Sequence, residues 1–190
     1  MSSKHAARVL IVQGHPDPRP AHFGCALADA YAAGAQAAGH EVKRIAVSEL
    51  NLPLLRTQEE WDAKCEIPGV VQSQESIAWA THVVIFYPLW MGTMPAILKG
   101  FFEQVFRPIF REKHLLKGKT ARIVITMGMP ALVYRWYFGA HGLKNLERNI
   151  LSFGGIKAVR ATLIGMVAAA KPRRRMRWVQ KMDILGGAAR

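Results

Sequence analysis

The feature that most constrains this chain is a repeated alternation of strand-like runs with segments that favour helix. Runs rich in β-branched and other apolar residues occupy 8–13, 41–47, 82–87, 121–126 and 157–164. Helical segments are predicted at 23–38, 70–80, 96–106 and 142–153, with partial helix in 57–69 and a closing helix after Pro172. Such alternation indicates parallel strands that are joined by helical crossovers.

The third strand-like run identifies the centre of the sheet. His82-Val-Val-Ile-Phe-Tyr87 is apolar almost throughout, as expected for a parallel strand covered on both faces. Five strands at this length predict an α/β, flavodoxin-like, doubly wound sheet in the order 2-1-3-4-5, with helices on both faces. With no linker or internal repeat, residues 1–190 are predicted to form a single domain that ends in a basic helix at about 171–190.

Composition narrows the class of protein. Hydrophobic residues make up 51% of the chain, and no apolar run approaches the length of a membrane span. The apolar run 9–12 is too short for a signal-peptide core, so a cytoplasmic protein is expected. Cys25 and Cys65 have no CxxC spacing and no histidine cluster, so neither a disulfide scaffold nor a metal site is predicted. The net charge of +13 favours anionic partners without choosing among them.

In a sheet of this kind, ligands bind beyond the carboxyl ends of the strands. The first loop there, 14–22, leads into a helix whose free N–H groups favour phosphate. It contains neither GxGxxG nor GxxxxGK[ST], so His15, Arg19 and His22 would have to supply donors. The alternative is a turn that its prolines merely stiffen.

Two further loops carry residues suited to a planar redox ligand. Loop 88–94 places a tryptophan and two methionines after the buried strand, where they either contact a flat ring or fill the core. Loop 126–141 is longer than most connections and offers Tyr134, Tyr137 and His141 as proton donors. Structural hydrogen bonds under a long loop are the alternative for each of these three residues.

A longer motif points to a family. Pro88-Leu89, followed by Met94-Pro-Ala-Ile-Leu-Lys-Gly-Phe-Phe-Glu-Gln-Val-Phe106, resembles the signature of the NAD(P)H:quinone oxidoreductases of flavodoxin-like fold, which include the potassium-efflux ancillary type. The PAxxKGxxExVF pattern is long and specific, and the resemblance runs from the first strand to the fifth.

The resemblance implies a bound flavin, FMN with FAD as the alternative, and NAD(P)H as the hydride donor to a quinone-like acceptor in a ping-pong cycle. It implies that Tyr134 and His141 assist hydride transfer, with Tyr137 as a substitute for Tyr134. It implies flavin phosphate at the first loop, the isoalloxazine edge at the second and its pyrimidine side at the third. The flavin-binding residues so predicted are His15, His22, Phe23, Pro88, Leu89, Trp90, Met91, Gly92, Thr126, Met127, Gly128 and Met129.

The resemblance also implies a homodimer, for which the loop aromatics Tyr134, Trp136, Tyr137 and Phe138 would suit the interface. Two alternatives to the enzyme remain. One is an electron carrier like the flavodoxins, which the charge of +13 disfavours because flavodoxins are acidic. The other is a regulatory subunit of a potassium-efflux system, in which the basic run 171–178 contacts anionic lipid or nucleic acid rather than forming a solvated helix face.

Overall fold

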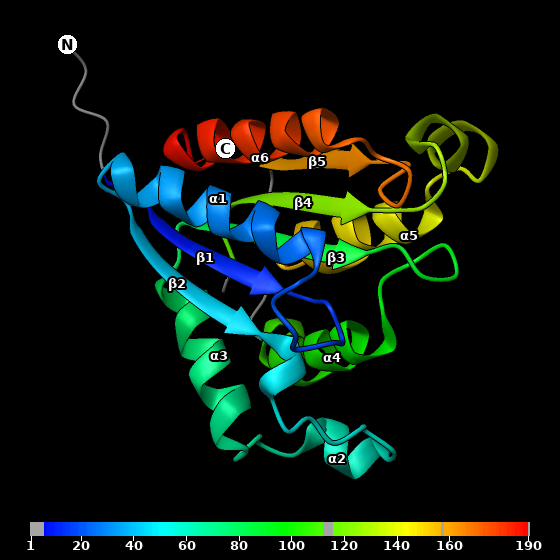
Figure 1. Ribbon diagram of the computed structural model, residues 1–190. Helices are drawn as coiled ribbons and strands as arrows, with labels where there is room; N and C mark the ends of the chain where they lie inside the picture. Colours follow the sequence, from blue (N-terminus) through cyan, green and yellow to red (C-terminus); the bar gives the residue numbers. More distant parts are fainter. Residues whose placement is uncertain (1–5, 112–115, 157, 190) are drawn as a thin grey trace.

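The computed structural model describes residues 6–111, 116–156 and 158–189. Its centre is a five-stranded parallel sheet in the order β2-β1-β3-β4-β5 (Figure 1). This confirms the predicted flavodoxin-like topology. The strands are β1 (Arg8–Gln13), β2 (Glu41–Ala46), β3 (His82–Pro88), β4 (Thr120–Thr126) and β5 (Ala158–Ile164).

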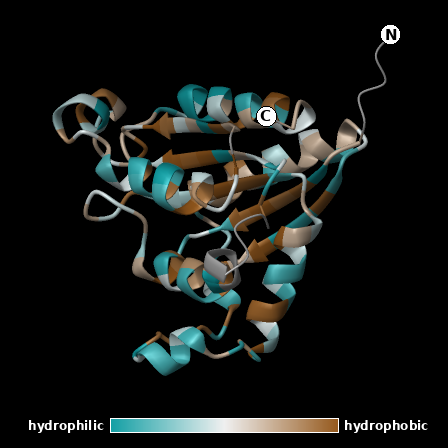
Figure 2. Cartoon of the chain, turned by 180° about the vertical axis from the view of Figure 1, so that it is seen from behind, coloured by the Kyte–Doolittle hydropathy of each residue, from teal (hydrophilic) through white to brown (hydrophobic). Residues whose placement is uncertain are grey.

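Helices cover both faces of this sheet. The larger ones are α1 (Phe23–Ala37), α3 (Pro68–Trp79), α4 (Ala96–Arg111) and α6 (Pro172–Gly187). Because successive side chains of a strand point to opposite faces, β1 sends Val9 and Ile11 to the layer with α1 and α6. Leu10 and Val12 point to the larger core, which α3 and α4 cover. Figure 2 shows the resulting apolar sheet between helices whose outer faces are hydrophilic.

The helices α1 and α6 approach each other so closely that glycine is required at the contact. A Cβ added at Gly34 would lie 2.0 Å from the carbonyl oxygen of Asp183, and one added at Gly186 would lie 2.0 Å from that of Tyr31. Neither neighbour is a flexible side chain, so any larger residue would force the two backbones apart. This contact fixes the C-terminal end of α6 against that of α1, at the end of α1 that is remote from the loop following β1 (Figure 1).

The structure corrects several predicted boundaries. Val47 leaves the second strand and begins the short 3₁₀ turn η1 (Val47–Glu49), and α4 continues past Phe106. A proline at the first helical position starts α3 two residues earlier than predicted. The partly helical region contains α2 (Gln58–Asp62), as expected.

The largest difference lies after β4. The predicted long loop contains a π-helical turn, η2 (Val133–Tyr137), and the predicted helix 142–153 is divided into α5 (His141–Lys144) and the π-helical η3 (Asn145–Ser152). Ala140, with a φ of 49°, separates η2 from α5. The expected first residue of the fifth strand, 157, lies outside the described residues.

Helix α6 confirms the predicted closing helix over 172–187. Of the helices described here, none combines the length and the apolar character that a membrane crossing requires.

Candidate functional site

The three predicted loops converge at the carboxyl ends of β1, β3 and β4. The ring of His15, after β1, meets the edge of the Trp90 ring, after β3, with 6.1 Å between centroids. The backbone N–H of Leu89 donates to the carbonyl of Thr126 at 2.8 Å, which joins the second loop to the third. The fold thus brings together residues that are more than a hundred positions apart in sequence.

The first loop presents unused donors at the start of α1. The N–H groups of Cys25 and Ala26 both donate to the carbonyl of His22. Those of Phe23 and Gly24 donate to no acceptor in the described part of the chain, as expected at a helix N-terminus. Free amides at this position attract anions, since the helix dipole adds a partial positive charge.

Two histidines lie side by side next to these amides. The rings of His15 and His22 stack with 3.9 Å between centroids and 20° between planes. Burial, followed by the neighbouring His22, lowers the pKa of His15 below its usual value of 6.5. An incoming phosphate would counter both effects by stabilising the protonated form of His15.

Asp17, which the sequence analysis did not single out, organises this loop. Its carboxylate pairs with the guanidinium of Arg19 and lies 3.0 Å from Nε2 of His22, while its N–H donates to Nδ1 of His15 at 3.0 Å. Hydrogen bonds from Arg19 are the main cause that holds the pKa of Asp17 far below its usual range. The pairing with Arg19 offsets a negative charge that would otherwise repel phosphate. An Asp two residues before an Arg is the only local sign of this turn.

The second loop forms a tight turn with an exposed tip. Trp90 and Thr93 exchange two backbone hydrogen bonds of 2.9 Å, and the intervening Met91 and Gly92 have left-handed φ angles of 48° and 79°. Trp90 is half exposed, whereas the side chain of Met91 is fully exposed and lies away from the core. Pro88 and Leu89 are partly buried at the base of the turn.

The third loop divides between core and solvent. Thr126 and Met129 are partly buried, and Gly128 is exposed with open space around its Cα. Met127 is 3% exposed and packs in the larger core, so only its backbone can face a ligand. Such a mixture of buried and exposed residues is expected where the carboxyl ends of the strands border a binding site.

Of the three predicted proton donors, one is buried and two are exposed. Tyr134 is 1% exposed, donates to the carbonyl of Gly92 at 3.3 Å and accepts from the N–H of Leu143 at 3.1 Å. Burial raises the pKa of its hydroxyl. His141 is exposed at the start of α5, and Tyr137 is 82% exposed. Tyr134 therefore cannot belong to the exposed aromatic surface predicted for a dimer, because η2 turns its ring inward.

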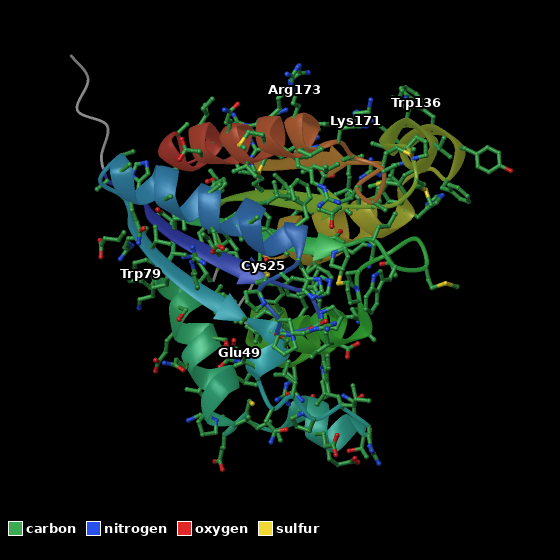
Figure 3. The ribbon with its side chains drawn as sticks, viewed as in Figure 1. Cys25, Glu49, Trp79, Trp136, Lys171 and Arg173 are labelled. Atoms are coloured by element: carbon green, nitrogen blue, oxygen red, sulfur yellow. The ribbon has the colours of Figure 1, made fainter. Side chains whose placement is uncertain are left out.

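The remaining predicted aromatics and part of the basic run lie at the same end of the molecule. Trp136 and Phe138 are exposed on η2, and Figure 3 shows Trp136 on that turn, with Lys171 and Arg173 near the start of α6. Within the run, Arg174 and Arg175 donate to the carbonyls of Gly165 and Val167 at 3.3 and 3.1 Å. These two arginines therefore also tie α6 to the loop that follows β5.

Comparisons with known proteins agree with this architecture. The chain is 25% identical over 181 residues to a ribosyldihydronicotinamide dehydrogenase-like protein of Penicillium crustosum, covering 76% of this chain and 64% of the relative. It is 29% identical over 167 residues to an uncharacterized NAD(P)H oxidoreductase of Haemophilus influenzae, covering 82% of each. The chain spans less than two thirds of the length of several such relatives.

A solved structure and a family match complete the comparison. A quinone reductase from Klebsiella pneumoniae, described as putative in its own structure, superposes with a TM-score of 0.80 at 20% identity, covering 95% of this chain and 83% of that one. At this identity the likeness establishes the fold alone. The family described as having a flavodoxin-like fold matches residues 7–183. Since that match spans nearly the whole chain, the protein belongs to this flavodoxin-like family, as the resemblance of its sequence predicts.

Proposed function

We propose that this protein is a flavin-dependent NAD(P)H oxidoreductase that reduces quinones or similar small electrophiles by hydride transfer in a ping-pong cycle. The observation that carries the proposal is the stacked pair of His15 and His22 beside the free N–H groups of α1, with Trp90 in a T-shaped contact with His15. The names of the relatives from Penicillium crustosum and Haemophilus influenzae support the same class of reaction.

The residues of the first loop fit a flavin phosphate. The amides of Phe23 and Gly24 supply two hydrogen bonds, and the imidazoles of His15 and His22 supply further donors beside them. Arg19 keeps Asp17 paired, which lowers the repulsion that the phosphate would meet. These contacts are expected of FMN, and of FAD through the phosphate next to its riboflavin part.

The second and third loops would hold the ring system. When bound, the flavin supplies the hydride chemistry, and the protein orients and polarises the reacting groups. Leu89, Trp90 and the backbone of Gly92 border one side of the site, while the backbone from Thr126 to Met129 borders the other. The open space at Gly128 permits close approach of a flat ligand. Met91 contributes its backbone, because its side chain lies in solvent.

His141 and Tyr134 take different parts in this proposal. The imidazole of His141 is exposed and can hold or donate a proton to an acceptor that gains charge. The Tyr134 hydroxyl already donates to the carbonyl of Gly92 and accepts from the N–H of Leu143. Tyr134 therefore acts as a positioning residue, which holds η2 against the second loop and the start of α5.

The exposed apolar surface around η2 supports a homodimer. Large side chains in this region are unusually accessible, and an aromatic-rich patch of this kind is typical of a protein interface. Such an interface would shield the mouth of the flavin site from water. The residues that would form it are Met91, Val133, Tyr137 and Phe138, since Leu132 and Trp136, which are also exposed, line a separate cavity along β5.

Purification with excess flavin and analysis of what remains bound tests this function. We expect one flavin per chain, identified by mass as FMN or FAD, and steady-state kinetics with parallel double-reciprocal lines when NADPH and benzoquinone are varied. The paired substitution His15→Gln and His22→Gln should release the flavin while leaving the unfolding temperature within a few degrees. A wild-type protein that retains no flavin, or that retains it without oxidising NADPH or NADH, would refute the proposal.

A further inference from the structure

A second cavity lies on the other side of η2, along the free edge of the sheet. It measures about 860 Å³ and runs along β5 between η2, α5 and η3 on one side and α6 on the other. We call it the β5 groove and define it by Arg135, Trp136, Lys144, Arg148, Ala161 and Trp178. None of the predicted flavin-binding residues lines it, so it is separate from the site of the three loops.

The edge of β5 offers unused backbone groups to this groove. β5 pairs with β4, and the carbonyl of Ile164 points to that neighbour, accepting from the N–H of Met127 at 2.9 Å. Because successive residues of a strand direct their backbone groups to opposite sides, those of Ala161 and Leu163 point outward. No described backbone group bonds to them there. Each can therefore offer a donor and an acceptor to a ligand.

The groove is strongly cationic. Four basic side chains line it, from Arg135 on η2 to Lys181 on α6, against the single carboxylate of Glu147. The ion pairs found in the described part of the chain lie elsewhere and involve none of these five residues. This excess positive charge, concentrated in a concave surface, favours an anion with several negative oxygens.

Two indoles complete the lining. Trp136 is 77% exposed on η2, although an unoccupied surface of this size is costly for an aromatic residue. Trp178 lies on the α6 side, where the ammonium of Lys181 sits 4.9 Å from the ring centroid. A flat, polar ring can stack on such an indole and form hydrogen bonds with the free backbone groups at its own edge.

From these features we infer that the β5 groove binds a purine nucleotide that carries at least two phosphates. The base stacks on an exposed indole and meets the outward backbone groups of Ala161 or Leu163. The phosphates lie among the basic side chains, and Glu147 accepts from the ribose hydroxyls. The volume of the cavity lies in the range of roughly 300 to 1,000 Å³ that small-molecule sites occupy.

A strand from an acidic protein is the other occupant that an open edge can take. The indoles favour the nucleotide, since a peptide strand needs no ring face beside the edge. The inference does not rest on the proposed oxidoreductase activity. The groove holds none of the predicted flavin-binding residues, and the test reads binding rather than turnover.

Isothermal titration of the flavin-saturated protein with ADP tests this site, with adenosine, pyrophosphate and a short polyaspartate peptide as comparison ligands. We expect ADP to bind at least about tenfold more tightly than each of the other three, because only ADP combines ring and phosphates. ADP should also quench the tryptophan fluorescence of the wild-type protein. The same addition of ADP should quench the fluorescence of the Trp136→Ala variant less. Saturating the protein with flavin beforehand keeps the three-loop site filled during the titration.

Matched charge reversals locate the binding. The pair Arg135→Glu and Arg148→Glu should lower the affinity for ADP by about tenfold or more. The pair Arg173→Glu and Arg177→Glu makes the same change of charge on exposed residues that do not line the groove, and should leave ADP affinity within about twofold. All four side chains are exposed, so the fold should survive, which circular dichroism verifies.

Four outcomes would overturn the inference. One is that ADP does not bind the wild-type protein at millimolar concentration. Another is that both charge-reversed pairs weaken ADP binding equally, which reduces the effect to overall charge. Equal affinity for ADP and pyrophosphate would remove the role of the indoles and leave a general anion patch. Tighter binding of polyaspartate than of ADP would assign the edge to an acidic peptide instead.

Discussion

The hydroxyl of Tyr134 accepts a hydrogen bond from the backbone N–H of Leu143 at 3.1 Å, across the left-handed turn at Ala140. The same hydroxyl donates to the carbonyl of Gly92 at 3.3 Å. One buried group thus connects η2, α5 and the turn after β3, which are the elements that carry the proposed proton donor and one wall of the flavin site. The position of His141 therefore depends on a residue that faces away from solvent.

Removing this hydroxyl should loosen the site as well as the fold. Tyr134→Phe leaves the N–H of Leu143 buried without a partner, so we expect a loss of about 1 to 3 kcal/mol in the free energy of unfolding. Quinone reduction should fall too, because η2 and α5 would no longer be held in place. Urea unfolding and steady-state kinetics measure the two effects. Tyr137→Phe, at an exposed hydroxyl, is the matched control and should change stability little; equal losses in both variants would contradict the assignment.

The lowered pKa of His15 predicts that flavin affinity depends on pH. In the free protein, burial and the neighbouring ring hold the pKa of His15 below 6.5. A bound phosphate raises that pKa, so binding takes up protons and FMN affinity should fall as pH rises through 6.5. Flavin fluorescence titrations across this range measure it. Riboflavin, which lacks the phosphate, is the control, and an equal pH dependence for both flavins would rule out the role given to the pair.

His82 predicts an acid sensitivity of the fold itself. Its Nε2 lies 2.9 Å from the Tyr31 hydroxyl and its Nδ1 lies 2.7 Å from that of Thr120. Burial, followed by the charge of Arg122, lowers its pKa from 6.5 to about 4. The unfolded chain therefore binds a proton between pH 6.5 and 4 that the native state does not, and stability is lost as pH falls through this window.

The expected loss in the free energy of unfolding is about 3 kcal/mol, from the difference between the pKa of His82 in the unfolded and in the folded protein. Urea unfolding at pH 7 and pH 4.5 measures it. His82→Gln keeps a polar side chain but cannot take up the proton, so its stability should vary less over the same range. If the substituted protein loses as much stability as the wild type, another group is responsible for the acid sensitivity.

The contact between α1 and α6 predicts which glycines are indispensable. Gly34→Ala or Gly186→Ala places a methyl group against backbone at 2.0 Å, and should destabilise the protein by several kcal/mol, since backbone must move. Gly100→Ala is the control within another helix. A Cβ there meets only the side chain of Leu54 at 3.7 Å, so helix propensity should leave stability unchanged or raise it by up to about 1 kcal/mol. Melting temperatures measure the effect. Those of Gly34→Ala and Gly186→Ala should lie below that of Gly100→Ala, and the opposite order would contradict the close contact between α1 and α6.

Much of the fold was predictable because each element carries its own local signal. The apolar run from His82 to Tyr87 predicts a central strand without knowledge of its neighbours, and strand order then follows from the rules of parallel sheets. The same rules predict that the loops after β1, β3 and β4 meet. Their meeting is visible in the contact of His15 with Trp90 and in the hydrogen bond from Leu89 to Thr126.

What the sequence could not predict depends on contacts between distant residues. Whether Tyr134 or Tyr137 faces inward is decided by the π-helical turn, which has no pattern of its own at this length. The burial of Met127 depends on the core beneath β4, and the β5 groove exists only because η2, η3 and α6 flank the last strand. The partners of Asp17 are all close in sequence, but only the folded turn orients His15, Arg19 and His22 towards it.

The most direct test of the central claim is an anaerobic titration of the flavin-loaded protein followed by its visible spectrum. One equivalent of NADPH should bleach the flavin band, and one equivalent of benzoquinone, added afterwards, should restore it completely, because each half of a ping-pong cycle transfers one hydride equivalent. If NADPH and NADH both leave the band of the bound flavin unchanged, or if the reduced protein is not reoxidised by the quinone, the account of this protein as a quinone-reducing oxidoreductase is wrong.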